Sequence, residues 1–299
     1  MGWIEKKLKY LLVAPALTIV TALAAFPLLQ SLIGSLFVWR LNRAPGPTKF
    51  IGLAHYERAL TDPLFWNSAM VTGLFTLSSV ILTTALSLSF AMALSVPGRS
   101  TRLMRVLLIL PFAMSPALIG MSFRYMFNAD FGVVPALLGL VWEPLGHVDW
   151  LADPAAALVV VILCDAWGWF PFMTMMIMGG LRTVPREAQE AARVDGATPW
   201  QVFRDVTLPC LKPVLLVAMV LKTIFCLKMF DQVFLLTNGG PSHATQTLSH
   251  YIYTQSMRFY DLGYGSALSW LLVLPMAALV FFYTRQILLQ SSARQRDAR

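Results

Sequence analysis

The sequence predicts an all-α integral membrane protein with six membrane-spanning helices. Of its 299 residues, 57% are hydrophobic and only 13% are charged, and the mean hydropathy is +0.65. A soluble domain carries about 25% charged residues, so this chain has too little charge to face water over its whole surface. The composition excludes an ordinary cytosolic enzyme, a disordered regulator and a disulfide-stapled secreted domain.

Six long apolar stretches account for the predicted spans. They cover about 10–39, 66–94, 106–127, 155–181, 213–236 and 267–284. A helix needs about 20 mainly apolar residues to cross a bilayer, whereas barrel strands need only about 9–11. The first stretch also exceeds the apolar region of a cleavable signal peptide, roughly 7–15 residues. All six are therefore expected to be retained helices.

The distribution of lysine and arginine predicts which side of the membrane each end occupies. Cytoplasmic segments of membrane proteins carry an excess of these residues. With the N-terminus inside, the cytoplasmic segments hold fifteen of the 23 Lys and Arg residues and the outer segments hold five. The other three, Arg124, Lys222 and Lys228, lie inside predicted spans. Both termini are therefore expected in the cytoplasm, and the net charge of +8 reflects this asymmetry rather than nucleic-acid binding.

The interval 182–212, between the fourth and fifth spans, is a polar cytoplasmic insertion with its own helix signals. Pro185 favours the first turn of a helix that runs to about Val194, and Gly196 supplies a turn after it. Thr198 and Gln201 then have the spacing of a capping box that opens a second helix.

The second helix of the insertion is predicted to stop at Leu208-Pro209, because proline interrupts an α-helix. The whole insertion is then a helix–turn–helix knob along the inner face of the membrane. A re-entrant or amphipathic connector is the alternative.

Several residues of this insertion stand at the spacings of a known signature. They are Glu190-Ala191-Ala192, Asp195-Gly196-Ala197, Phe203, Leu208-Pro209 and Pro213. Together they resemble the EAA loop of ABC importer permeases, which forms a coupling helix docked on a separate ATP-hydrolysing subunit. The coupling residues that the resemblance implies are Glu190, Ala191, Ala192, Asp195, Gly196 and Phe203. Small side chains let a partner backbone approach closely, and Glu190 offers a carboxylate to a partner arginine or backbone donor.

Shorter motifs extend the resemblance over nearly the whole chain and narrow it to carbohydrate importers. They are Phe50-x-Gly52-Leu53-x-x-Tyr56 with Asp62 and Phe65; Pro111-Phe112, Pro116, Arg124, Phe127 and Gly132; Lys228-x-Phe230-Asp231 and Leu236-Thr237-x-Gly239-Gly240-Pro241; and Gly263-Tyr264-Gly265-Ser266-Ala267. The sequence departs from the family pattern at Phe123, where a Trp is common, and at Pro135, where an Asn is common. The resemblance implies the type I importer permease fold, a single transmembrane domain over 1–299 with 182–212 as its coupling loop.

No motif for ATP binding is present in the sequence. It contains no G-x-x-x-x-G-K-[ST] and no Gly-Lys pair, so it has no P-loop. Its Cys, His and acidic residues lack the spacings typical of a catalytic or metal site. We therefore expect no enzyme activity, metal or cofactor in this chain. The resemblance assigns ATP and Mg to partner ATPase subunits.

Polar and aromatic residues inside the fourth span are candidate substrate contacts. A charge near the bilayer centre is costly and normally faces a cavity or a partner. Asp165, Trp167 and Trp169 combine a carboxylate for hydroxyl groups with aromatic faces for C–H surfaces, which suits a carbohydrate. The alternative is an aromatic belt at the membrane interface.

The remaining candidates, on the fifth and sixth spans, are Lys228, Asp231, Gln232, Ser266 and Ser269. Lys228 and Asp231 are three residues apart and are predicted to share one helical face, either as an ion pair or as hydrogen-bonding groups toward a sugar. Lys222 lies roughly 120° away on an α-helix and is assigned to another surface. The two serines either face the same cavity or hydrogen-bond between helices.

The resemblance implies a permease subunit of an ATP-driven ABC importer that moves a sugar, polyol or glycoside inward by alternating access. The implied partners are a second, similar permease, two copies of an ATPase subunit and an extracytoplasmic solute-binding protein, in a bacterial cytoplasmic membrane. No nucleic acid is expected. Two alternatives stay open: an ion-gradient-driven secondary transporter, and an ABC permease for an amino acid, peptide or ion.

Overall fold

The computed structural model describes the backbone of residues 2–95 and 98–297 and the side chains within 13–95, 98, 101–283 and 285. Within this range the chain forms two units. Unit 1 comprises Met1–Phe65 and Ile252–Leu274, and unit 2 comprises Trp66–Tyr251 and Pro275–Arg299. The basic residues used above for orientation that lie outside the described side chains are Lys6, Lys7, Lys9, Arg99, Arg294, Arg296 and Arg299.

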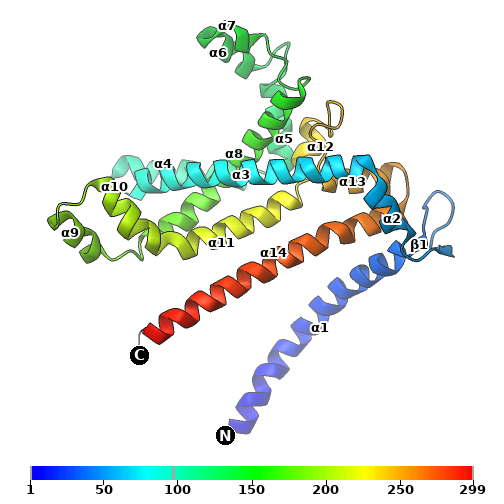
Figure 1. Cartoon of the computed structure of the whole chain (residues 1–299), viewed down its shortest axis with the longest axis horizontal. Coiled ribbons are helices and arrows are strands. Elements are labelled where there is room, and N and C mark those ends of the chain that lie inside the picture. The colour runs from blue at the N-terminus through cyan, green and yellow to red at the C-terminus, as the bar shows by residue number, and fades with distance from the viewer. Residues whose placement is uncertain (1, 96–97, 298–299) are drawn as a thin grey trace. The chain divides into compact units, whose positions relative to one another are not determined.

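Unit 1 combines a long N-terminal helix with a small hairpin and short helices (Figure 1). Its elements are α1 (Gly2–Ser35), β1 (Phe37–Val38), β2 (Lys49–Phe50), α2 (Ala54–Thr61), the π-helical turn η2 (Thr254–Arg258) and the start of α14 (Leu262–Asp297). The strands pair antiparallel with Phe37 opposite Phe50. The first predicted span was expected to end at residue 39, but its helix ends at Ser35. The Ser35 hydroxyl lies 2.8 Å from the Tyr56 hydroxyl.

Unit 2 consists of helices joined by loops, with no strand among its described residues. Its elements are α3 (Pro63–Ser95), α4 (Arg99–Ala113), α5 (Pro116–Met126), α6 (Val133–Val141), α7 (Glu143–Gly146), α8 (Pro154–Leu181), α9 (Arg186–Val194), α10 (Pro199–Gln201), η1 (Val202–Thr207), α11 (Leu208–Leu227), α12 (Asp231–Leu236) and α13 (Leu248–Tyr253), with α3 and α13 reaching unit 1 at one end. Its buried core lies between α3, α5, α8 and α11–α12, around residues such as Phe75, Ile119, Val160 and Val233.

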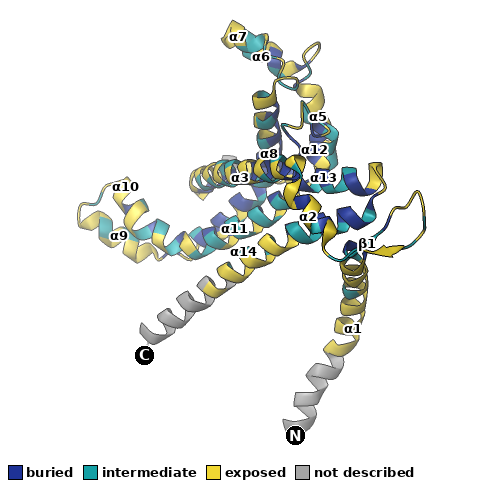
Figure 2. Ribbon diagram, turned by 45° about the vertical axis from the view of Figure 1, so that its right-hand side comes forward, coloured by how far each residue is buried: buried dark blue, intermediate teal, exposed yellow. Residues whose placement is uncertain are grey.

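Five described helices are long and apolar enough to cross a membrane. Their qualifying ranges are Val13–Ser35, Pro63–Ser95, Pro154–Leu181, Pro199–Leu227 and Leu262–Tyr283, and a broken pair, Thr101–Ala113 with Pro116–Met126, brings the number to six. Large apolar side chains are exposed along these helices, most completely along α1 (Figure 2). Exposing so much apolar surface to water is unfavourable, so these side chains are expected to contact lipid or partner subunits.

The third predicted span, 106–127, is two helices rather than one. α4 and α5 meet at an angle of 96° across Met114 and Ser115. Pro116 lacks the backbone N–H that would continue the helix, and the Ser115 hydroxyl accepts from the Leu118 amide at 3.2 Å. The proline and the serine cap therefore end one helix and begin the next.

The fifth predicted span, 213–236, is also broken. α11 ends at Leu227, Lys228 caps it, and a new helix begins at Asp231. Phe230, with φ −133° and ψ −57°, lies outside the helical region. The prediction that Lys228 and Asp231 share one helical face is therefore wrong, because no continuous helix joins them.

The polar insertion over 182–212 begins as predicted and ends differently. Thr198 and Gln201 form both hydrogen bonds of the capping box, at 2.7 and 3.4 Å. The helix does not stop at Pro209, however, but continues through η1 into α11. A π-helical turn is wider than an α-helical one, so it accommodates the proline that would interrupt a regular α-helix.

Candidate functional site

A cavity of about 350 Å³ lies in unit 2 where α11 breaks before α12. Its lining comes from α5, α8, α11, the break and α12, and consists of Pro116, Asp165, Trp169, Phe225, Lys228, Met229, Phe230, Asp231 and Gln232. Five of these were predicted pathway residues: Asp165, Trp169, Lys228, Asp231 and Gln232. The break in the helix places Lys228, Asp231 and Gln232 at the same cavity as the two residues of α8. Irregular backbone of this kind is tolerated inside a membrane protein where it lines a cavity.

Asp165, which lines this cavity, forms a buried ion pair with Lys222. Its Oδ2 atom accepts from Lys222 Nζ at 2.5 Å and from the Ser79 hydroxyl, and the Cys226 thiol lies 3.7 Å away. The side chains of Asp165 and Lys222 are 4% and 0% exposed. Helical periodicity assigned Lys222 to another surface; in the structure it is the counter-ion of Asp165, a predicted pathway residue.

The same lysine also supports the aromatic wall of the cavity. Lys222 Nζ lies 5.1 Å from the ring centroid of Trp169, within cation–π range. The Trp169 ring packs against Phe225 at 4.4 Å between centroids. Lys222 therefore contacts both the carboxylate and the indole, which fixes their relative position.

The polar wall of the cavity comes from the break itself. Lys228 and Asp231 are exposed, and Gln232 is 4% exposed. The structure records no ion pair between Lys228 and Asp231, although both side chains are described. Both charges are therefore available to a ligand.

Gly120 brings α12 close to α5 beside this wall. A Cβ atom at position 120 would lie 3.0 Å from the Gln232 Cα and 3.2 Å from its carbonyl oxygen. On the same side of α5, Arg124 donates to the Leu235 carbonyl at 3.3 Å. These two contacts position the start and the end of α12, and neither was identified from the sequence.

Three predicted pathway residues lie elsewhere. Trp167 is 48% exposed and packs against Phe170, with 5.9 Å between ring centroids. Ser266 and Ser269 belong to unit 1, and the Ser269 hydroxyl donates to the Gly265 carbonyl of its own helix at 2.8 Å. None of the three lines the cavity in unit 2.

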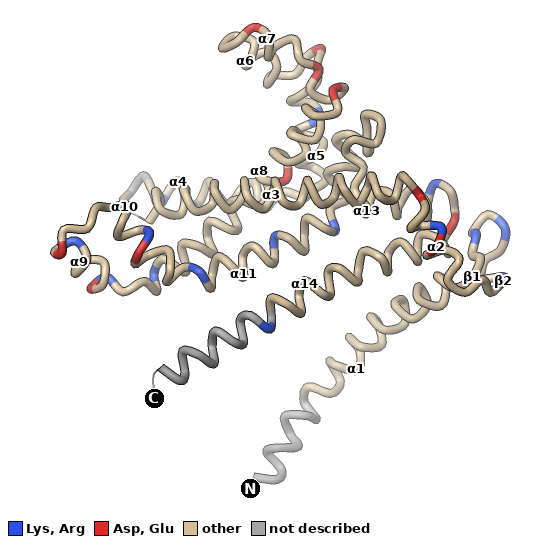
Figure 3. The backbone as a smooth tube through the Cα atoms, viewed as in Figure 1, with Lys and Arg blue, Asp and Glu red and all other residues tan. Residues whose placement is uncertain are grey.

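The knob formed by residues 186–207 presents the predicted coupling residues at its surface. Glu190, Ala191, Asp195 and Gly196 are exposed, and Ala192 and Phe203 are half-buried. Charges of both signs lie on α9 (Figure 3). Gly196 adopts a φ of +86°, a left-handed conformation that favours glycine and turns the chain from α9 toward α10.

Two large apolar side chains on the knob were not singled out from the sequence. Val194 and Trp200 are 86% and 65% exposed on either side of the turn. The Trp200 ring packs against Phe203 at 5.4 Å. Exposed apolar groups of this size, rimmed by charge, are typical of a surface that a partner protein covers. Only their exposure in the structure identifies them as candidate contact residues, because no spacing in the sequence singles them out.

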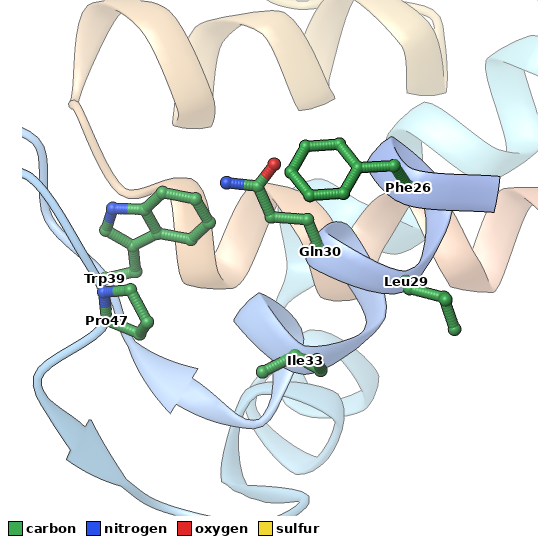
Figure 4. Close-up of a pocket in the computed structure, with 6 residues that line it drawn as sticks. All are labelled: Phe26, Leu29, Gln30, Ile33, Trp39 and Pro47. Atoms are coloured by element: carbon green, nitrogen blue, oxygen red, sulfur yellow. The ribbon is translucent and has the colours of Figure 1, made fainter. Parts of the chain in front are cut away.

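Unit 1 has a cavity of its own, of about 390 Å³, between α1 and the hairpin. Its lining is Phe26, Leu29, Gln30, Ile33, Trp39 and Pro47, with the Gln30 amide lying between the rings of Trp39 and Phe26 (Figure 4). None of the predicted pathway residues belongs to it. With one polar side chain, it offers little for a hydrophilic ligand.

A polar cluster in unit 1 fastens the start of α14 to α2. Asp261 accepts from Arg58 at 3.2 Å, and the Arg58 guanidinium lies 3.9 Å from the Tyr264 ring centroid. His55 Nε2 lies 3.1 Å from the Phe37 carbonyl oxygen, and burial lowers the pKa of this imidazole below its ordinary value of 6.5. A Cβ on Gly263 would lie 2.5 Å from the same carbonyl oxygen, which explains the glycine.

Comparison with known proteins gives consistent results. The family model for the binding-protein-dependent transport system inner membrane component matches residues 85–291. The trehalose/maltose transport system permease protein MalF of Thermococcus litoralis is 34% identical, over 94% of this chain and 94% of that protein. The sulfoquinovosyl glycerol transport system permease protein SmoG of Agrobacterium fabrum is 35% identical, over 89% and 85%. The lactose transport system permease protein LacF of Rhizobium radiobacter is 34% identical, over 91% of each.

A solved structure shares the fold. One chain of a bacterial ABC transporter involved in the import of the acidic polysaccharide alginate superposes with a TM-score of 0.80 at 20% identity, covering 96% of this chain and 97% of that one. The long apolar helices and the family match agree with one another. The chain therefore belongs to the family of binding-protein-dependent transport system inner membrane components, the permease subunits of ABC importers.

Proposed function

We propose that this permease carries a carbohydrate or a related polyol or glycoside, and that the cavity at the α11–α12 break contacts it. One observation carries the proposal: the lining of the cavity combines an aromatic side chain, Trp169, with hydrogen-bonding groups, Asp231 and Gln232. A sugar presents C–H surfaces to the first and hydroxyl groups to the second. The relatives named for trehalose/maltose and lactose transport support the same substrate class.

The knob is the proposed contact with an ATPase subunit. Glu190 offers a carboxylate to a basic residue, while Val194 and Trp200 offer apolar area that a groove would bury. This assignment puts the knob and both termini in the cytoplasm. The proposed assembly contains a second permease, two ATPase subunits that bind ATP and Mg, and an outer solute-binding protein.

ATP then drives transport through the knob. Binding of ATP draws the two ATPase subunits together, and the knob passes this movement to α11, with which it forms one helical stretch over Pro199–Leu227. ATP drives the change only because it binds one global conformation more tightly than the other. The cavity is thereby exposed alternately to each side of the membrane.

Two other models of transport, one with a different energy source and one with a different cargo, require different properties of the cavity. An ion-gradient-driven carrier would use intramembrane charges for ion coupling, and the candidates are Asp165, Asp231, Lys222 and Lys228. Asp165 and Lys222, however, neutralise each other at 2.5 Å. An ABC permease for an amino acid would pair both charged ends of its ligand, and Lys228 and Asp231 are the available partners. The amino-acid model is the second candidate, and ligand binding separates it from the first.

The decisive experiment is affinity purification of tagged chain from its native membrane, followed by mass spectrometry of its stoichiometric companions. We expect a second permease and an ATPase, and we expect the associated solute-binding protein to bind sugars rather than amino acids. Reconstituted complex should take up that sugar only with ATP. Uptake by this chain alone, driven by an ion gradient without ATP, would overturn the proposal.

A further inference from the structure

A second polar cavity in unit 2, of about 450 Å³, lies where the C-terminal ends of α3 and α8 meet α4 and the first turn of α9. Three arginines line it: Arg105 from α4, Arg182 at the end of α8, and Arg186 at the start of α9. Its volume falls within the range of small-ligand sites, roughly 300–1,000 Å³. None of the coupling or pathway residues named above lines it.

The positive charge of this cavity is not compensated by the described part of the chain. None of the three arginines has a carboxylate within ion-pair distance among the described residues. Arg105 Nη2 donates to the Leu94 carbonyl at 2.5 Å, which holds the guanidinium at the end of α3. Its Nε atom is shielded from solvent and has no hydrogen-bond partner in the described part of the chain. A shielded donor without an acceptor is costly, so an acceptor from outside the chain would stabilise it.

The first turn of α9 adds to the positive potential. Its N-cap, Pro185, provides no side-chain hydrogen bond to the first amides of the helix. The N-terminus of a helix carries a partial positive charge and free N–H groups, which favour an anion. Glu187 lies in the same turn, but it does not line the cavity.

An apolar surface adjoins the charged one. Met178, Leu181 and Val184 also line the cavity, and the polar residues Ser95 and Gln189 complete its lining. On α4, large apolar side chains flank Arg105 and are exposed: Leu103 at 62%, Met104 at 53%, Val106 at 61% and Leu107 at 53%. A ligand that fits both surfaces is anionic at one end and apolar at the other.

We propose that this cavity binds the phosphate of an anionic phospholipid from the cytoplasmic leaflet, with the acyl chains along α4. Arginine suits a phosphate because its planar guanidinium donates two parallel hydrogen bonds, and basic pockets on the cytoplasmic side of membrane proteins bind such headgroups. The choice of leaflet rests on the cytoplasmic position of the knob proposed above. A free phosphate shares the headgroup chemistry but has no use for the apolar surface.

The test is native mass spectrometry of the intact importer in detergent with either phosphatidylglycerol, which is anionic, or phosphatidylcholine, which is neutral overall. The main variant is Arg182→Gln/Arg186→Gln, because both side chains are exposed and neither has an ion-pair partner among the described residues. The matched control, Arg102→Gln/Arg193→Gln, removes the same number of positive charges from α4 and α9, two helices that contribute to the cavity, but neither residue lines it. A second variant, Arg105→Lys, keeps the charge and removes the forked donor.

We expect wild type and the control to retain phosphatidylglycerol and not phosphatidylcholine. The main variant should bind phosphatidylglycerol at least roughly tenfold more weakly than wild type. Arg105→Lys should weaken binding in the same direction. Equal retention of the two lipids, or unchanged binding by the main variant, would overturn the proposal. So would displacement of the lipid by inorganic phosphate alone, or a cross-link that places a partner subunit's carboxylate in the cavity. The measurement needs no transport, so its failure is distinct from failure of the proposed sugar uptake.

Discussion

Lys222 Nζ lies 2.5 Å from Asp165 Oδ2, and both side chains are almost completely buried between α11 and α8. Removing one partner of such a pair leaves an uncompensated charge in an apolar environment, which destabilises a protein by about 3–5 kcal/mol. We expect Asp165→Asn and Lys222→Met each to lower the thermal unfolding midpoint of the purified complex strongly. The double variant, which removes both charges, should recover most of the loss. Additive losses in the double variant would show that the two residues do not act as a pair.

The two tryptophans of α8 separate a role in substrate contact from one in packing. Trp169 lines the cavity, whereas Trp167 is 48% exposed outside it. We expect Trp169→Ala to raise the KM for sugar uptake by roughly three- to tenfold, because a stacked aromatic face is lost. Trp167→Ala should leave the KM close to that of wild type, and Trp169→Phe should fall between the two. Equal effects at both positions would remove Trp169 from the pathway.

Gly196 tests the knob. Its φ of +86° disfavours a side chain by about 1–2 kcal/mol, and glutamate adds a charge to the surface proposed to face the ATPase. We expect Gly196→Glu to abolish ATP-driven uptake while the protein still inserts into the membrane. Gly196→Asn is the control, since asparagine tolerates the left-handed conformation, and it should retain most uptake. Normal uptake and ATPase stimulation in Gly196→Glu would contradict the coupling assignment.

Gly120 and Gly179 form a second matched pair. A Cβ at 120 would lie 3.0 Å from the Gln232 backbone, whereas one at 179 meets nothing within 4 Å. We expect Gly120→Ala to reduce stability by about 1–3 kcal/mol through overpacking between α5 and α12. Gly179→Ala should be neutral or stabilising by roughly 0.5–1 kcal/mol, because alanine favours helix. Thermal unfolding of both variants decides the matter; an unaffected Gly120→Ala would mean that α12 can shift without loss.

His55 predicts a pH dependence. Burial lowers its pKa below 6.5, so the folded protein binds a proton less readily than the unfolded chain. The stability linked to this neutral imidazole is fully present above about pH 6.5 and is lost as pH falls toward the lowered pKa. Between about pH 7.5 and 5.5 we expect the thermal midpoint to fall more for wild type than for His55→Gln. Identical slopes would show that another group controls the acid response.

Much of the protein could be predicted from local patterns in the sequence. Apolar runs identify the spans because a bilayer demands about 20 such residues in succession. The capping box of Thr198 and Gln201 forms as its spacing indicates, since its two hydrogen bonds close within a single helical turn. Glu190 and Gly196 belong to a contiguous signature, so the family resemblance is legible without a structure and agrees with the family match over 85–291.

Tertiary contacts decided the rest. Helical periodicity predicted that Lys228 and Asp231 share one helical face and that Lys222 lies on another. In the structure the helix breaks after Leu227, and Lys222 pairs with Asp165, 57 residues earlier in the chain. The arginine cavity likewise draws Arg105 and Arg186 from α4 and α9, which are far apart in sequence. A sequence pattern reports residues that are neighbours along a helix. Ion pairs and cavities depend on which helices pack together, and packing is settled only when the whole chain has folded.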